Sequence, residues 1–157
     1  MGTLAYRLVR DDFMLFIAGN DELSESEWND YLVALTEAAT RLRPARRPLN
    51  FLCFVEDARP DAKQRAAVID ALLGVPSKTA VITTSLLARN VITVFNWLGL
   101  NVKGFAPAAF DKVSDYLDLP STMLEQTLAL ARVLASSIGG GVGALEAVER
   151  ARYSDRV

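Results

Sequence analysis

The stretch from residue 79 to residue 119 constrains the fold most, because it alternates two kinds of secondary-structure pattern. Thr79–Thr83 is a short apolar run rich in β-branched residues, and a helical pattern that ends at Gly99 follows it directly. Asn101–Phe105 is a second short run, followed by a second helical pattern that ends near Leu119. Strand, helix, strand, helix within about forty residues is typical of helices that cover a sheet containing parallel strands. We therefore predict an α/β fold.

The segments before residue 79 extend this order toward the N-terminus. The polar tripeptide Arg10-Asp11-Asp12 separates two apolar runs, which predicts an antiparallel hairpin with a tight turn. Ser24 can cap a helix in which apolar residues recur at helical spacing. In chain order, these further elements are strands at 4–9 and 13–18, a helix at 24–42, a strand at 49–55 and a helix at 61–73. The expected order is ββαβαβαβα, with a small mixed β-sheet.

The pattern changes after Pro120, which predicts a core domain over residues 1–119 and a C-terminal helical extension and tail over 120–157. Ser121–Ile138 carries two adjacent apolar stripes, and a helix that covers one small sheet can bury only one of them. Met123, Leu130 and Val133 belong to the second stripe, so we predict self-association through these residues. The alternative is that the helix folds back over an open face of the sheet and is satisfied within the monomer.

Composition and charge exclude several classes of function. The formal charge of −2 provides no basic field for the phosphates of a nucleic acid. No uncharged apolar run approaches the roughly 20 residues of a membrane span, and the first residues lack the apolar segment of a signal peptide. The single cysteine, Cys53, cannot form an internal disulfide, which is consistent with a reducing compartment. We expect a cytoplasmic protein.

The chain contains no histidine, which removes the commonest general base and the commonest metal ligand. Lysine or carboxylate chemistry would have to carry any activity, and we predict no catalytic residue and no cofactor. Glu56, Asp57 and Asp61 could hold Mg²⁺ with waters, but Asp61 can equally cap the helix that it precedes. Cys53 lies in the middle of an apolar strand, so we predict a buried, unreactive thiol.

The order ββαβαβαβα resembles a STAS domain of the SpoIIAA-like branch (STAS/SEC14-like), related to the anti-sigma-factor antagonists. The resemblance covers about residues 4–119. It is clearest in Ala80–Thr83, in Val91–Gly99 and in Val102–Phe105, together with the helical pattern at 110–117. It implies a small mixed sheet with helices largely on one side. It also implies a regulatory or assembly role through binding another protein, of identity unknown, rather than catalysis.

The resemblance further implies a partner-binding surface, because related domains bind through the loop and helix after the third strand. This assigns Asp57, Arg59 and Asp61, together with Arg89, to the interaction with a partner. Antagonists that are switched by phosphorylation carry a serine or threonine near the start of that helix. The segment 56–64 contains no hydroxyl side chain, so such a switch is not expected.

Two other functions stay open at this level. Asp57 could be the phosphoacceptor of a receiver-like domain, with Thr83 or Thr84 and Lys103 as its neighbours. Against this, the acidic pair Asp11-Asp12 is followed by a strand, whereas receivers follow their acidic pair with a helix. The second alternative is a module that binds a small apolar ligand or a lipid, since related folds bind apolar molecules.

Overall fold

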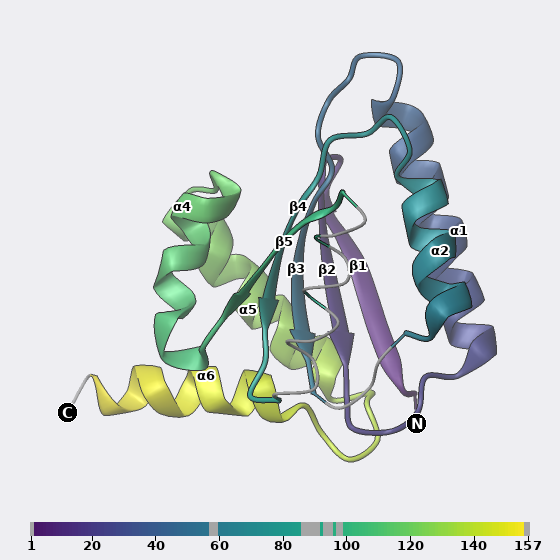
Figure 1. Cartoon of the computed structure of the whole chain (residues 1–157). Helices are drawn as coiled ribbons and strands as arrows, with labels where there is room; N and C mark the ends of the chain where they lie inside the picture. Colours follow the sequence, from purple (N-terminus) through teal and green to yellow (C-terminus); the bar gives the residue numbers. More distant parts are fainter. Residues whose placement is uncertain (1, 57–59, 86–91, 93–95, 97–98, 156–157) are drawn as a thin grey trace.

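A five-stranded sheet forms the centre of the described part of the chain. The computed structural model describes residues 2–56, 60–85, 92, 96 and 99–155. The strand order is β1-β2-β3-β4-β5, in which β1 pairs antiparallel with β2 and the other neighbours pair in parallel (Figure 1). The strands are β1 (Leu4–Arg10), β2 (Phe13–Ala18), β3 (Asn50–Val55), β4 (Lys78–Ile82) and β5 (Asn101–Phe105). The predicted α/β class and mixed sheet are confirmed.

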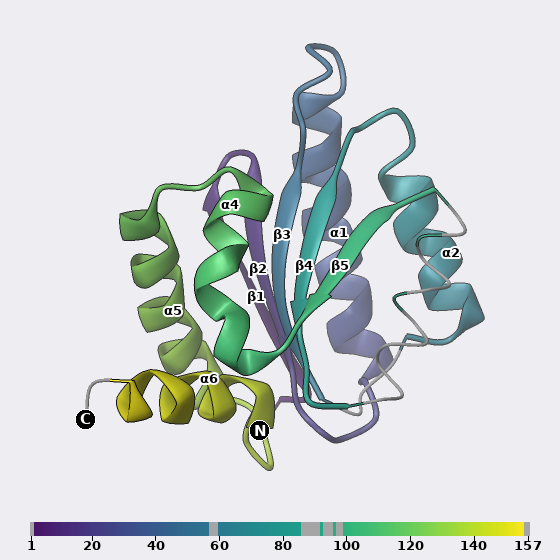
Figure 2. The same cartoon turned by 60° about the vertical axis from the view of Figure 1, so that its left-hand side comes forward.

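Helices cover both faces of this sheet. On one face lie α1 (Glu25–Leu42) and α2 (Ala62–Ala71), and on the other lie the 3₁₀ helix η1 (Pro107–Lys112), α4 (Val113–Leu117), α5 (Ser121–Ala135) and α6 (Gly143–Ser154) (Figures 1 and 2). The expectation of helices largely on one side is therefore wrong. The physical reason is visible in β2, whose six residues are all buried, because a strand that is apolar on both sides needs cover on both.

The helix predicted between Thr83 and Gly99 lies mostly outside the described residues. Ile92 and Asn96 are described, and both are helical. The Asn96 side chain accepts a hydrogen bond from the backbone N–H of Val102 and donates one to its carbonyl, each at 2.9 Å. This pair of bonds links the segment to β5.

The start of α1 is fixed by a small polar network. The Ser24 side chain caps the helix by accepting from the backbone N–H of Glu27. The Glu27 carboxylate accepts hydrogen bonds from the backbone and the hydroxyl of Thr3, and these bonds outweigh burial and lower its pKa. The network ties the N-terminal segment to α1, whose buried stripe begins with Trp28 and Tyr31.

The opposite face of the sheet has its own core, to which the C-terminal helices belong. Leu124 and Leu128 of α5 and Leu145 and Val148 of α6 are buried in one cluster with residues of β2, β3 and β4. The segment predicted as an extension thus shares a core with the sheet. No helix in the described part of the chain is both long enough and apolar enough to cross a bilayer.

Candidate ligand-binding cavity

Helix α2 stands away from the sheet that it faces. It packs mainly against α1, and none of its ten residues is buried (Figures 1 and 2). Its sequence explains this placement, because Ala62–Ala71 offers only Val68 and Ile69 as large apolar side chains. Beneath it, Cys53 and Val55 of β3 and Thr79 of β4 stay only partly buried. The space between α2 and the sheet is a cavity.

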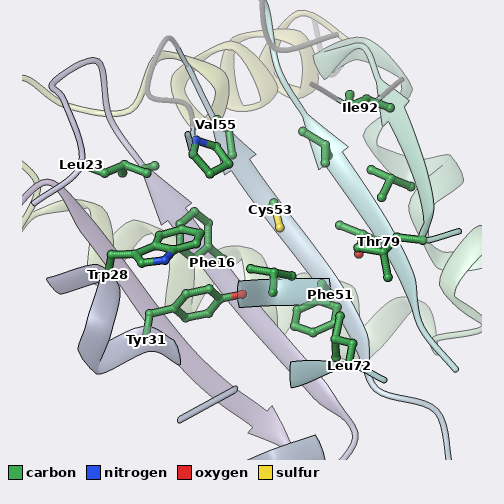
Figure 3. Close-up of a pocket in the computed structure, with 16 residues that line it drawn as sticks. Phe16, Leu23, Trp28, Tyr31, Phe51, Cys53, Val55, Leu72, Thr79 and Ile92 are labelled. Atoms are coloured by element: carbon green, nitrogen blue, oxygen red, sulfur yellow. The ribbon is translucent and has the colours of Figure 1, made fainter. Parts of the chain in front are cut away.

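The cavity has a volume of about 120 Å³ and is partly open to solvent. Its floor is the sheet, including Cys53 of β3 and Val81 of β4, and its wall on the α1 side holds Trp28 and Tyr31 (Figure 3). Val68 of α2 closes it from above. Among the described residues that line it, none carries a charge. Such a lining favours an apolar occupant over water, which needs two to four polar partners.

The size of the cavity sets the scale of the ligand. An apolar cavity of about 150 Å³ engineered in another protein stays dry and binds benzene. At about 24 cal/mol per Å³, leaving 120 Å³ empty forgoes up to about 3 kcal/mol of packing free energy. A ligand the size of one aromatic ring or a short alkyl chain would recover much of that free energy.

The titratable groups that line the cavity are held in their neutral forms. Burial raises the pKa of the Cys53 thiol to about 12, so the thiolate nucleophile is absent at neutral pH. This agrees with the prediction of an unreactive thiol. Burial likewise raises the pKa of Tyr31, with a smaller contribution from Cys53, so its hydroxyl stays protonated. The cavity therefore presents neutral hydrogen-bonding groups rather than acids and bases.

The predicted partner-binding residues are only partly described. Asp57, Arg59 and Arg89 lie outside the described residues. Asp61 caps α2 in a reciprocal capping box: it accepts from the backbone N–H of Gln64, whose side chain accepts from the Asp61 N–H, both at 2.8 Å. Of the two roles considered for Asp61, helix capping and magnesium binding, the structure shows helix capping. In the part of the chain that is described, no group of three or more His, Cys, Asp or Glu residues could hold a metal.

Two positions that bear on the receiver-like hypothesis, Asp12 and Lys103, lie away from the carboxyl ends of β3 and β4. Asp12 precedes β2 and so lies at the amino ends of the parallel strands β2 and β3. Glu56 follows β3 and lies at their carboxyl ends. The register of β2 and β3 separates the two positions by roughly 20 Å. Lys103 lies level with Ala80 within the sheet, and its Nζ lies over the rings of Phe105 and Tyr116. Asp57 itself is not described, so the phosphoacceptor stays an untested prediction.

Thr83 and Thr84, the other members of that hypothesis, lie at the carboxyl end of β4. Thr83 is buried, and its hydroxyl accepts a hydrogen bond from the backbone N–H of Ser85 at 3.0 Å. The Thr84 hydroxyl donates to the Glu56 carboxylate at 2.9 Å. The bond between Thr84 and Glu56 joins the carboxyl ends of β4 and β3.

The residues predicted to mediate self-association divide into two groups. Met123 and Leu130 are partly buried against the core of their own chain, as the alternative of intramolecular cover requires. Val133 is 66% exposed. Self-association through α5 stays a prediction, and it now depends on Val133.

If α5 mediates a dimer, Val133→Asp should convert it to a monomer in sedimentation velocity, because an unpaired carboxylate would be buried at the interface. The melting temperature should stay nearly unchanged, since exposed substitutions usually alter stability by less than about 0.5 kcal/mol. Val33→Asp is the matched control, because Val33 is 59% exposed on α1. A wild-type chain that sediments as a strict monomer at high micromolar concentration would exclude this dimer.

Comparisons of the chain with protein-family models, with curated proteins and with solved structures give no significant match. The resemblance to the STAS domain therefore stays a prediction.

Proposed function

We propose that this chain is a non-enzymatic binding module that takes up a small apolar ligand between its sheet and helices α1 and α2. The observation that carries the proposal is the cavity of about 120 Å³, whose described lining residues include none with a charge. Ligand sites in proteins are concave and mostly apolar, with a few polar groups that orient the bound molecule. This cavity has that composition.

Binding rather than catalysis is supported by the chemistry of the same residues. A general base must be able to exchange a proton near neutral pH. The raised pKa values of Cys53 and Tyr31 keep both groups protonated there, and the sequence supplies no histidine.

A regulatory or assembly role through a protein partner, as the resemblance implies, is part of the same proposal. One observation favours it: Pro60 lines the cavity, and Asp61, the residue directly after it, caps α2. The segment assigned to partner binding therefore adjoins the wall that a ligand would touch. Occupancy of the cavity would bias the position of α2, and so the surface that a partner meets.

Toluene tests the binding function directly. A ligand that binds only the folded state at ten times its Kd adds about 1.4 kcal/mol to the free energy of unfolding. For a chain of 157 residues this should raise the melting temperature by roughly 3 to 6 °C. Benzenesulfonate is the control, since its ring is similar but its charge would lose hydration in an apolar cavity. A melting temperature that toluene leaves unchanged or lowers, up to its solubility limit, would refute the proposal.

A further inference from the structure

The hydroxyl of Tyr31 is directed toward the cavity and makes no hydrogen bond to another described residue. The Tyr31 side chain lines the cavity and the residue is 6% exposed. Figure 3 shows its oxygen pointing away from α1, toward the space between Cys53 and Phe51. Burial and the nearby Cys53 account for its raised pKa, with no hydrogen bond contributing. Tyrosine hydroxyls in largely buried side chains usually find a hydrogen-bond partner, and a ligand in the cavity can supply one here.

A second unpaired donor lies in the same wall. The indole N–H of Trp28 is buried and has no hydrogen-bond partner among the described residues. The Trp28 and Tyr31 rings are 5.4 Å apart between centroids, and the face of an aromatic ring is only a weak acceptor. Two polar groups without a hydrogen bond to another described residue therefore lie in the α1-side wall of a cavity whose lining is mostly apolar.

We propose that the ligand carries one neutral acceptor oxygen, of the ketone, aldehyde or ester class, which accepts a hydrogen bond from the Tyr31 hydroxyl while its apolar body fills the cavity. This inference rests on the proposed function and specifies its ligand. We assign an acceptor to the ligand because the neutral Tyr31 hydroxyl can donate a hydrogen bond and the neighbouring indole N–H of Trp28 can only donate.

The requirement for neutrality follows from the lining. A carboxylate that entered the cavity would lose its hydration. No described lining residue carries a positive charge that could pair with it, and an unpaired buried charge is strongly disfavoured. A carbonyl oxygen loses much less hydration and regains one hydrogen bond from Tyr31.

Three ligands of similar shape test the acceptor oxygen and the neutrality separately. Ethylbenzene has no acceptor, acetophenone has a neutral one, and benzoate carries a charge. We expect isothermal titration calorimetry to show binding of the first two and none of benzoate. Tyr31→Phe removes only the hydroxyl. It should lower the ratio of acetophenone affinity to ethylbenzene affinity by about threefold to tenfold, the usual effect of one hydrogen bond. The ¹³C carbonyl shift of bound acetophenone should move upfield in the variant, a readout that does not depend on protein stability.

Tyr6→Phe is the matched control, because the Tyr6 ring packs 5.5 Å from that of Tyr31 but does not line the cavity. It should leave the ratio unchanged. An unchanged ratio in Tyr31→Phe, or benzoate binding as tightly as acetophenone, would overturn this inference while the proposed function stands. Failure of both ethylbenzene and acetophenone to bind the wild-type chain would overturn the proposed function and this inference with it.

Discussion

Deletion of residues 120–157 should leave a chain that no longer unfolds cooperatively. The deletion removes α5 and α6, whose Leu124, Leu128, Leu145 and Val148 are buried against the sheet. Burying each such side chain contributes about 1.5–3 kcal/mol, so the loss is comparable to the 5–15 kcal/mol that stabilises a whole domain. Circular dichroism should show no sharp thermal transition, and the uncovered sheet face should bind the dye 1-anilinonaphthalene-8-sulfonate.

The control is a chain that ends at Ser154, which keeps both helices and should melt like the full chain. The experiment also decides the predicted domain boundary. A soluble fragment 1–119 with a cooperative transition would show that the core domain predicted from the sequence is independent of its extension. It would contradict the view that both helices complete the core.

Replacement of Cys53 by phenylalanine should abolish ligand binding without unfolding the chain. Cys53 lies on β3 in the floor of the cavity (Figure 3), and the larger ring would occupy most of the space that a toluene molecule needs. We expect the affinity for toluene to fall at least about tenfold, while filling the void stabilises the unliganded protein by roughly 0.5–2 kcal/mol. Thermal unfolding with and without toluene measures both effects.

Cys53→Ala is the counterpart at the same position. It enlarges the cavity and should keep toluene binding, at a cost in stability from the lost packing of the sulfur. If Cys53→Phe binds toluene as tightly as the wild type does, the ligand occupies some other place, and the cavity is not the site.

The order of strands and helices could be predicted because it depends on local pattern. The apolar runs of β1 to β5 and the helical spacing of α1, α5 and α6 are visible in the sequence, and α2 is marked by its cap at Asp61. The expectation that the helices lie largely on one side of the sheet was wrong. It came from the resemblance to the STAS domain and not from the residues. Phe13–Ala18 is apolar at every position, and this signal alone indicated cover on both faces. The same second face covers the first apolar stripe of Ser121–Ile138 and part of the second, while Val133 stays exposed.

The cavity could not be predicted, because it depends on where α2 rests rather than on any motif. Trp28 and Tyr31 fall on the buried stripe of α1, and helical spacing does not reveal whether such a ring meets packed atoms or a void. One signal was available: Ala62–Ala71 is too poor in large apolar side chains to fill the space above a sheet. The residues singled out instead, around Asp57 and Asp61, were assigned to partner binding from the resemblance to the STAS domain, and none of those that are described lines the cavity.

The most direct measurement is an isotope-filtered nuclear Overhauser experiment on the ¹³C-labelled chain with unlabelled toluene. Our account predicts contacts from the ring protons of toluene to the methyl groups of Val55, Val68 and Val81, all of which line the cavity. Contacts to Val33 and Val133, which are exposed on the outer faces of α1 and α5, should be absent. Contacts spread over those outer faces, with none to the three cavity valines, would contradict it.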